Sequence, residues 1–142
     1  MIVTKRYTFR EKISWSLYDW ANSVFATTVL AGFFPLFFKS YWAGDLDDAT
    51  STALLGTASS VAGLIIVLIA PLLGAMADLS RKKKVFLSIF ALLGIISTSI
   101  LFFISYGLWQ WSLIIFGLSV IGFSGANIFY DSLLIDVSSN ED

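Results

Sequence analysis

The chain has 142 residues, of which 57% are hydrophobic and only 13% are charged, and its net charge at pH 7 is −1. A soluble globular domain carries about 25% charged residues, so this composition excludes an ordinary soluble domain and indicates a chain surrounded by lipid. The absence of cysteine and histidine removes disulfides, thiolate metal sites and the usual neutral-pH base. We therefore expect an all-α membrane protein that is not an enzyme and holds no metal or cofactor.

Residues 1–12 carry four cations and one glutamate, and we expect them to form a cytoplasmic segment. No small-residue cleavage site follows a short apolar core, so the segment is not typical of a cleaved signal peptide. Residues 13–38 form the first predicted span, which is long enough for the ~30 Å hydrocarbon core of a bilayer. Aromatic residues at its two ends predict interfacial belts. They are Trp15, Tyr18, Trp20, Tyr41 and Trp42.

One face of the first span is polar. At helical spacing it gathers Asp19, Asn22, Ser23, Ala26 and Thr27. A polar stripe on a membrane helix faces protein or water rather than lipid. A carboxylate within a span is costly unless it is paired, hydrated or protonated, and it marks a solute or proton site by default.

Residues 39–51 form an acidic outer loop with Asp45, Asp47 and Asp48. Their spacing lacks the glycine and the distal glutamate of an EF-hand calcium loop, so we interpret the loop as solvated rather than metal-binding.

The second predicted span covers residues 52–77. Small residues on one of its faces predict close packing against another helix. They are Gly56, Ser59, Ser60, Gly63, Ala70 and Gly74. Pro71 removes one backbone hydrogen bond and predicts a bend.

The stretch from Val85 to Tyr130 has no charge and is long enough for two spans, which we place at residues 85–105 and 109–134. The third span is the most apolar, so we expect it to be the most exposed to lipid. The fourth turns polar at its inner end, where Ser124, Asn127 and Asp131 share a face, and Phe129 with Tyr130 predicts an inner aromatic belt. Residues 135–142 form a tail.

Cations set the orientation, because short loops rich in Lys and Arg stay in the cytoplasm. Of the nine Lys and Arg residues, only Lys39 lies outside the N-terminal segment and the basic loop at residues 78–84. The prediction is four transmembrane helices with both termini in the cytoplasm.

Two carboxylates, Asp19 and Asp131, fall in the inner third of predicted spans, and no basic residue within a span can pair with them. Either burial makes them proton carriers, or they line a water-filled cavity. The alternative is that each reaches the inner surface and serves structure only. With Asn22, Ser23 and Asn127, they are our candidate residues for a solute or proton pathway.

The basic loop has a recognisable pattern. Gly74 and Asp78, followed by Arg81 and three lysines, resemble the loop signature of the major facilitator superfamily. That signature reads G-x-x-x-D-[RK]-x-G-x-[RK]-[RK], and this chain departs from it at Leu79 and Arg81.

Three further segments resemble the vacuolar amino-acid effluxer-like (autophagy-related) branch of that superfamily, and the resemblance covers essentially the whole chain. They are residues 18–23 (YDWANS), 33–38 (FFPLFF) and 129–134 (FYDSLL). The resemblance implies a secondary active transporter of small solutes, with amino acids as the suggested class, working by alternating access. It also implies that spans one and four line the cavity while span three is peripheral. Gly74, Asp78, Arg81 and Lys82 would be part of a cytoplasmic latch.

Members of this superfamily have twelve spans, so the resemblance implies that this chain is the N-terminal four-span portion and does not transport alone. Its expected partners are the bilayer, a small solute and eight further spans in cis or in trans, with no nucleic acid. A self-contained four-span dimeric proton-coupled antiporter is the main alternative. A small non-transporting membrane protein, such as a holin or an assembly subunit, is another.

Overall fold

The computed structural model describes residues 9–79 and 82–137, and all its regular elements within those ranges are helices. They are α1 (Phe9–Val24), η1 (Phe25–Phe33), α2 (Phe34–Phe37), η2 (Phe38–Trp42), α3 (Asp48–Leu79), α4 (Lys83–Leu101) and α5 (Trp109–Val137). The first four follow one another without a break and form a single long helix whose η parts are π-helical. Four helices in the described part of the chain are long and apolar enough to cross a membrane, so the predicted all-α, four-helix class is confirmed.

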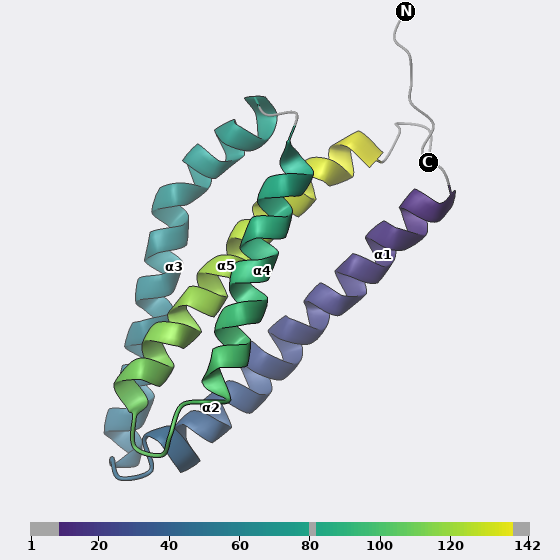
Figure 1. The fold of residues 1–142 in the computed structure, drawn as a ribbon. Coiled ribbons are helices and arrows are strands. Elements are labelled where there is room, and N and C mark those ends of the chain that lie inside the picture. Colours follow the sequence, from purple (N-terminus) through teal and green to yellow (C-terminus); the bar gives the residue numbers. More distant parts are fainter. Residues whose placement is uncertain (1–8, 80–81, 138–142) are drawn as a thin grey trace, which may run out of the picture.

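The centre of the bundle is α5, which packs against both α3 and α4 (Figure 1). Glycines of α5 allow its backbone to lie close to α4. A Cβ atom added at Gly122 would lie 2.9 Å from the Phe90 carbonyl oxygen and 2.8 Å from the Gly94 Cα atom. Gly125 is equally tight, because its Cβ would run into the ring of Phe90. Only a residue without a side chain allows two helix backbones to approach this closely.

We name the two ends of the bundle after their predicted sides, the outer end being the one that holds residues 34–46 and 101–109. At this outer end a buried aromatic cluster joins the first span to the others. The side chains of Phe34, Phe38 and Trp42 are at most 2% exposed. The Phe34 ring stacks on Phe116 of α5, with 3.7 Å between centroids. The Trp42 indole donates its Nε1–H to the Ile104 carbonyl over 3.1 Å. These contacts fix α2 and η2 against α5 and against the loop that follows α4.

Several boundaries differ from those expected. The helix of the first span begins at Phe9 and continues to Trp42, and α3 begins at Asp48, so the acidic outer loop shrinks to residues 43–47. Asp47 explains the early start, because its carboxylate accepts a hydrogen bond from the Thr50 N–H over 2.9 Å and caps the helix. At the other boundary α4 ends at Leu101, short of the expected residue 105.

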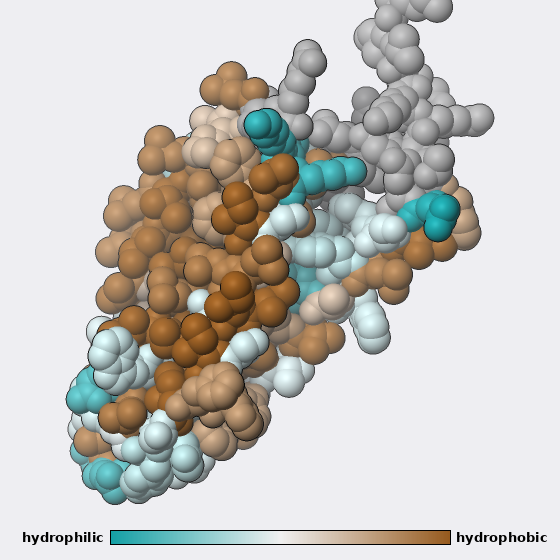
Figure 2. All heavy atoms as spheres, in the orientation of Figure 1, coloured by the Kyte–Doolittle hydropathy of each residue, from teal (hydrophilic) through white to brown (hydrophobic). Residues whose placement is uncertain are grey.

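The exposure of the spans corrects one expectation. In the most apolar window of α3, 6% of residues are buried, against 17% in α4, so the second span rather than the third is the more exposed. Three glycines of α3 do not meet a helix in the described structure. A Cβ added at Gly56, Gly63 or Gly74 would have nothing within 4 Å. Figure 2 shows hydrophobic residues over most of the middle of the bundle and hydrophilic residues mainly at its two ends.

Some predicted belt residues are core residues instead. Phe129 and Tyr130 are 0% and 6% exposed, and Trp42 is also buried. By contrast, Trp20 near the inner end and Trp111 near the outer end are exposed, as expected of side chains at an interface. The expectation of belts is therefore wrong for the residues that face α5 or the aromatic cluster, because helix packing competes for the same aromatic rings.

Candidate functional site

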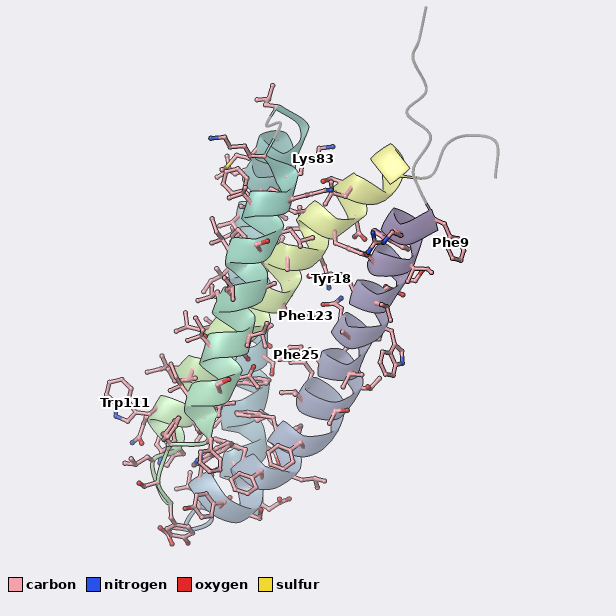
Figure 3. All side chains as sticks on the ribbon, turned by 45° about the vertical axis from the view of Figure 1, so that its right-hand side comes forward. Phe9, Tyr18, Phe25, Lys83, Trp111 and Phe123 are labelled. Carbon is pink, nitrogen blue, oxygen red and sulfur yellow. The ribbon has the colours of Figure 1, made fainter. Side chains whose placement is uncertain are left out.

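The first span meets α5 along a seam of paired side chains. At its inner end Trp15 stacks on Tyr130 with 4.6 Å between ring centroids, and Tyr18 lies 5.1 Å from the same ring. Further out, Phe25 contacts Phe123 at 4.9 Å, and Figure 3 shows these two residues on facing helices. We name this set of contacts, with the amide pair described next, the α1–α5 seam. Its members recur every three or four residues, which places them on one face of each helix.

A single pair of amides interrupts the aromatic seam. Asn22 donates its Nδ2–H to Asn127 Oδ1 over 2.6 Å, and both side chains are half-buried. The two residues were predicted separately as pathway candidates, and the structure brings them into direct contact. Each amide keeps further donor and acceptor capacity beyond this bond. The pair can therefore exchange its mutual hydrogen bond for bonds to a polar solute.

Two donors at the inner end of the seam are buried in the described structure. They are Trp15 Nε1, which has no hydrogen-bond partner among the described groups, and the Tyr130 hydroxyl, which lies next to the Asp19 carboxylate. An unsatisfied buried donor costs about 1–3 kcal/mol, so such groups are rare without a functional or solvent partner. Both can donate to an acceptor atom of a solute or to water.

The candidate carboxylates border this inner part of the seam. Asp19 and Asp131 are exposed in the described structure, and both lie close enough to the Tyr130 hydroxyl for their charges to act on it. Ser23 is exposed one turn along the first span. The structure therefore separates the predicted set into an amide pair on the seam and three residues beside it, namely Asp19, Ser23 and Asp131.

A cavity of about 360 Å³ lies between the first span, α4 and α5. Tyr18 and Asn22 bring polar groups to its wall, whereas most of its surface comes from small and apolar side chains. The lining is Tyr18, Ala21, Asn22, Phe25, Ala91, Gly94, Ile95, Thr98, Ser99, Phe123 and Ala126. The hydroxyls of Thr98 and Ser99 donate to carbonyls of their own helix. The cavity thus offers an apolar space with its polar groups at one side, a combination typical of small-molecule sites.

Comparison with known proteins identifies the kind of protein that carries this seam. Residues 40–138 match the family described as "Vacuole effluxer Atg22 like". This chain belongs to the Atg22-like family. It is also 44% identical, over 135 residues and 94% of its length, to the uncharacterized MFS-type transporter YxiO of Bacillus subtilis (strain 168). No solved structure matches the chain.

The match to YxiO covers 31% of that protein, so the chain spans about a third of the length of this relative. Membership of the Atg22-like family, with four candidate spans, makes the chain an integral membrane protein of a transporter family. It does not favour a self-contained four-span antiporter, a holin or an assembly subunit. Besides the first span and α5, α4 also lines the cavity, and the expected peripheral place of this helix in a whole transporter stays a prediction.

The loop that resembles the superfamily signature is described only in part. Gly74 faces open space and Lys82 is exposed before α4. Arg81 and the side chain of Asp78 lie outside the described residues, so the predicted latch of the Atg22-like chain stays a prediction. Lys83 was not predicted as a site residue. Its Nζ donates to the Ser132 carbonyl over 3.2 Å, which ties the start of α4 to the inner end of α5 (Figure 3).

Sequence reasoning also missed the aromatic half of the seam. Trp15, Tyr18 and Tyr130 were interpreted as interfacial aromatics, and no role was predicted for Phe25 or Phe123. The spacing of Trp15, Tyr18, Asn22 and Phe25 in steps of three and four residues could have revealed the shared face. The same steps recur at Phe123, Asn127 and Tyr130.

Proposed function

We propose that this chain forms part of a secondary active transporter that moves small solutes by alternating access, with amino acids as the solute class. Support comes from its membership of the Atg22-like family and from the cavity beside the α1–α5 seam. The observation that carries the proposal is the Asn22–Asn127 hydrogen bond, because Asn22 also lines the cavity. Amide groups can bind the polar part of an amino acid while the apolar wall accommodates its side chain.

In this proposal Asp19 and Asp131 carry the coupling proton. Both are carboxylates on spans that border the cavity. Residues 78–84 form the cytoplasmic latch through Asp78, Arg81 and Lys82, and both termini lie in the cytoplasm. Further spans, in cis or in trans, complete the pathway.

The test joins this chain to the part of YxiO that lies beyond the match. The chimera is reconstituted in liposomes and assayed for uptake of radiolabelled amino acids under an imposed proton gradient. We expect gradient-driven uptake, and we expect Asp19→Asn to abolish the response to the gradient while leaving exchange of bound solute. Replacing Lys39 by Gln is the control and should leave uptake unchanged, because Lys39 pairs with Asp48 over 2.8 Å and does not line the cavity.

Uptake of no amino acid by a correctly inserted chimera would exclude this solute class. Uptake that responds to the gradient equally in the Asp19→Asn variant would make Asp19 a structural residue.

A further inference from the structure

The first span contains nine consecutive π-helical residues, Phe25–Phe33. At the end of this segment the Phe34 N–H donates to the Val29 carbonyl, five residues back, whereas an α-helix pairs residues four apart. π-Helical stretches are rare, are mostly single turns and often lie at functional sites. Contacts with the surrounding structure must therefore stabilise a π-helical segment of this length.

The π-helical winding keeps the side chains of the first span in register with those of α5. Phe25 contacts Phe123 at the inner end of η1, and Phe34 contacts Phe116 just beyond its outer end. Nine steps along the first span therefore match seven steps along α5. Seven α-helical steps rise about 10.5 Å, whereas nine rise about 13.5 Å. The wider π winding shortens the segment so that both ring pairs form at once.

The rotation of side chains about the helix axis also favours a π-helical segment. At 3.6 residues per turn, nine α-helical steps make about two and a half turns, which would put Phe34 on the opposite face from Phe25. At roughly 4.4 residues per turn, as bonds between residues five apart require, nine steps make about two full turns. Phe25 and Phe34 share a face only because the segment between them is π-helical.

We propose that η1 is a two-state hinge, and that its conversion to an α-helix releases the inner half of the first span from α5. In the α state the Phe25–Phe123 and Phe34–Phe116 contacts cannot both form. One half of the span must then separate from α5. The outer half is held by the buried side chains of Phe34, Phe38 and Trp42 and by the hydrogen bond from Trp42. The inner half is held by Trp15, Tyr18 and Asn22, which are only half-buried, so it is the half that moves.

The sequence of η1 suits such a change. Gly32 has no Cβ, and one placed there would lie 3.3 Å from the Thr27 carbonyl oxygen in the π winding. Pro35 lacks an N–H, so the backbone ladder is interrupted next to η1 in either winding. Thr28 and Ala31 are exposed and can rotate without breaking a packed contact.

The moving half carries one wall of the cavity, made by Tyr18, Ala21, Asn22 and Phe25. Release of this wall opens the cavity and breaks the Asn22–Asn127 hydrogen bond, while the outer end stays closed. The hinge is thus a property of this helix, measurable without any solute, and it survives if the proposed amino-acid transport fails.

Spin labels test the hinge in the whole chain in lipid nanodiscs. The protein has no cysteine, so introduced cysteines carry the only labels. Labels at Leu17 and Ile89, both exposed on α1 and α4, report the inner end. Labels at Leu36 and Phe103, also exposed, report the outer end. We expect two inner distances and one outer distance in the wild type, measured by double electron–electron resonance.

Two variants bias the hinge in opposite directions. Deletion of Thr28 and Ala31 leaves seven steps between Phe25 and Phe34, so an α-helix satisfies both ring pairs and only the shorter inner distance should remain. Gly32→Ala disfavours the π winding and should raise the population of the longer inner distance at least twofold. Gly56→Ala is the matched control, since nothing lies within 4 Å of that site, and it should match the wild type. A single inner distance that Gly32→Ala leaves unchanged would overturn the hinge, whatever the deletion does.

Discussion

At the scale of single residues, the Asn22–Asn127 bond is the polar contact that sets the register of the α1–α5 seam. Aromatic rings tolerate small shifts along a helix, but an amide bond of 2.6 Å does not. In a membrane, breaking such a bond leaves amide groups with few alternatives to each other. Measured polar contacts between membrane helices nevertheless average only about 0.6 kcal/mol, with a maximum near 1.7.

A double-mutant cycle measures this contact. We expect Asn22→Ala and Asn127→Ala each to destabilise the chain by about 1–2 kcal/mol, because each leaves the other amide unpaired. The double variant should lose less than the sum, with a coupling energy of about 0.5–1.5 kcal/mol. Reversible unfolding in mixed micelles gives these values. Additive losses would show that the two amides do not interact in the folded chain.

The Tyr106–Asp45 contact makes a prediction about pH. Tyr106 donates its hydroxyl to Asp45 Oδ1 over 2.8 Å, and this hydrogen bond is the main cause that raises the pKa of Tyr106 above its ordinary value of 10.0. Because the folded pKa is raised, the contact contributes fully below pH 10 and is lost as the pH rises through the raised pKa. Asp45→Ala should return the titration toward pH 10. Tyrosinate absorbance, with Tyr106→Phe to assign the signal, tests this, and identical titrations with and without Asp45 would contradict it.

At the scale of elements, small residues were only a partial guide to packing. Glycines in α3 and in α5 look alike in the sequence, yet Gly122 meets the backbone of α4 whereas Gly56 and Gly63 of α3 meet nothing. The pattern predicts that a face can be approached closely, but it does not name the partner helix. The hydrophobic runs predicted the four helices because length and apolarity are local properties. The η1 winding was not predictable from local preference, since register against α5 explains it.

The close approach at Gly122 is a sharp test of the α4–α5 contact. A methyl group there meets the Phe90 carbonyl oxygen and the Gly94 backbone, which cannot move without shifting a helix. We expect Gly122→Ala to destabilise the chain by about 1–3 kcal/mol. Gly117→Ala on the same helix is the control, because nothing lies within 4 Å of it, and Ala is favoured over Gly in a helix by about 1 kcal/mol. Equal stability of the two variants would show that α4 and α5 pack differently.

At the scale of the whole molecule, the candidate site depends on contacts between segments about a hundred residues apart. Asn22 and Asn127 were each predictable as polar residues in apolar spans, because a lone amide is conspicuous there. That they touch, and that Tyr130 is buried between Trp15 and Tyr18, follows from how α1 docks on α5. The seam and the aromatic cluster together join the first span to α5 by side-chain contacts at several levels, from Trp15 to Phe34.

The orientation of this assembly in the membrane is the last prediction. Eight of the nine Lys and Arg residues lie in the N-terminal segment and the basic loop, and cations in short loops are retained in the cytoplasm. Because the chain has no cysteine, a single cysteine at Ala49, which is exposed at the outer end of α3, reports one side, and a cysteine at Ser80 reports the other. We expect a membrane-impermeant maleimide to label Ala49→Cys in intact cells and Ser80→Cys only after permeabilisation. The opposite pattern would invert the molecule, and with it the assignment of the basic loop and of the moving end of the first span to the cytoplasmic side.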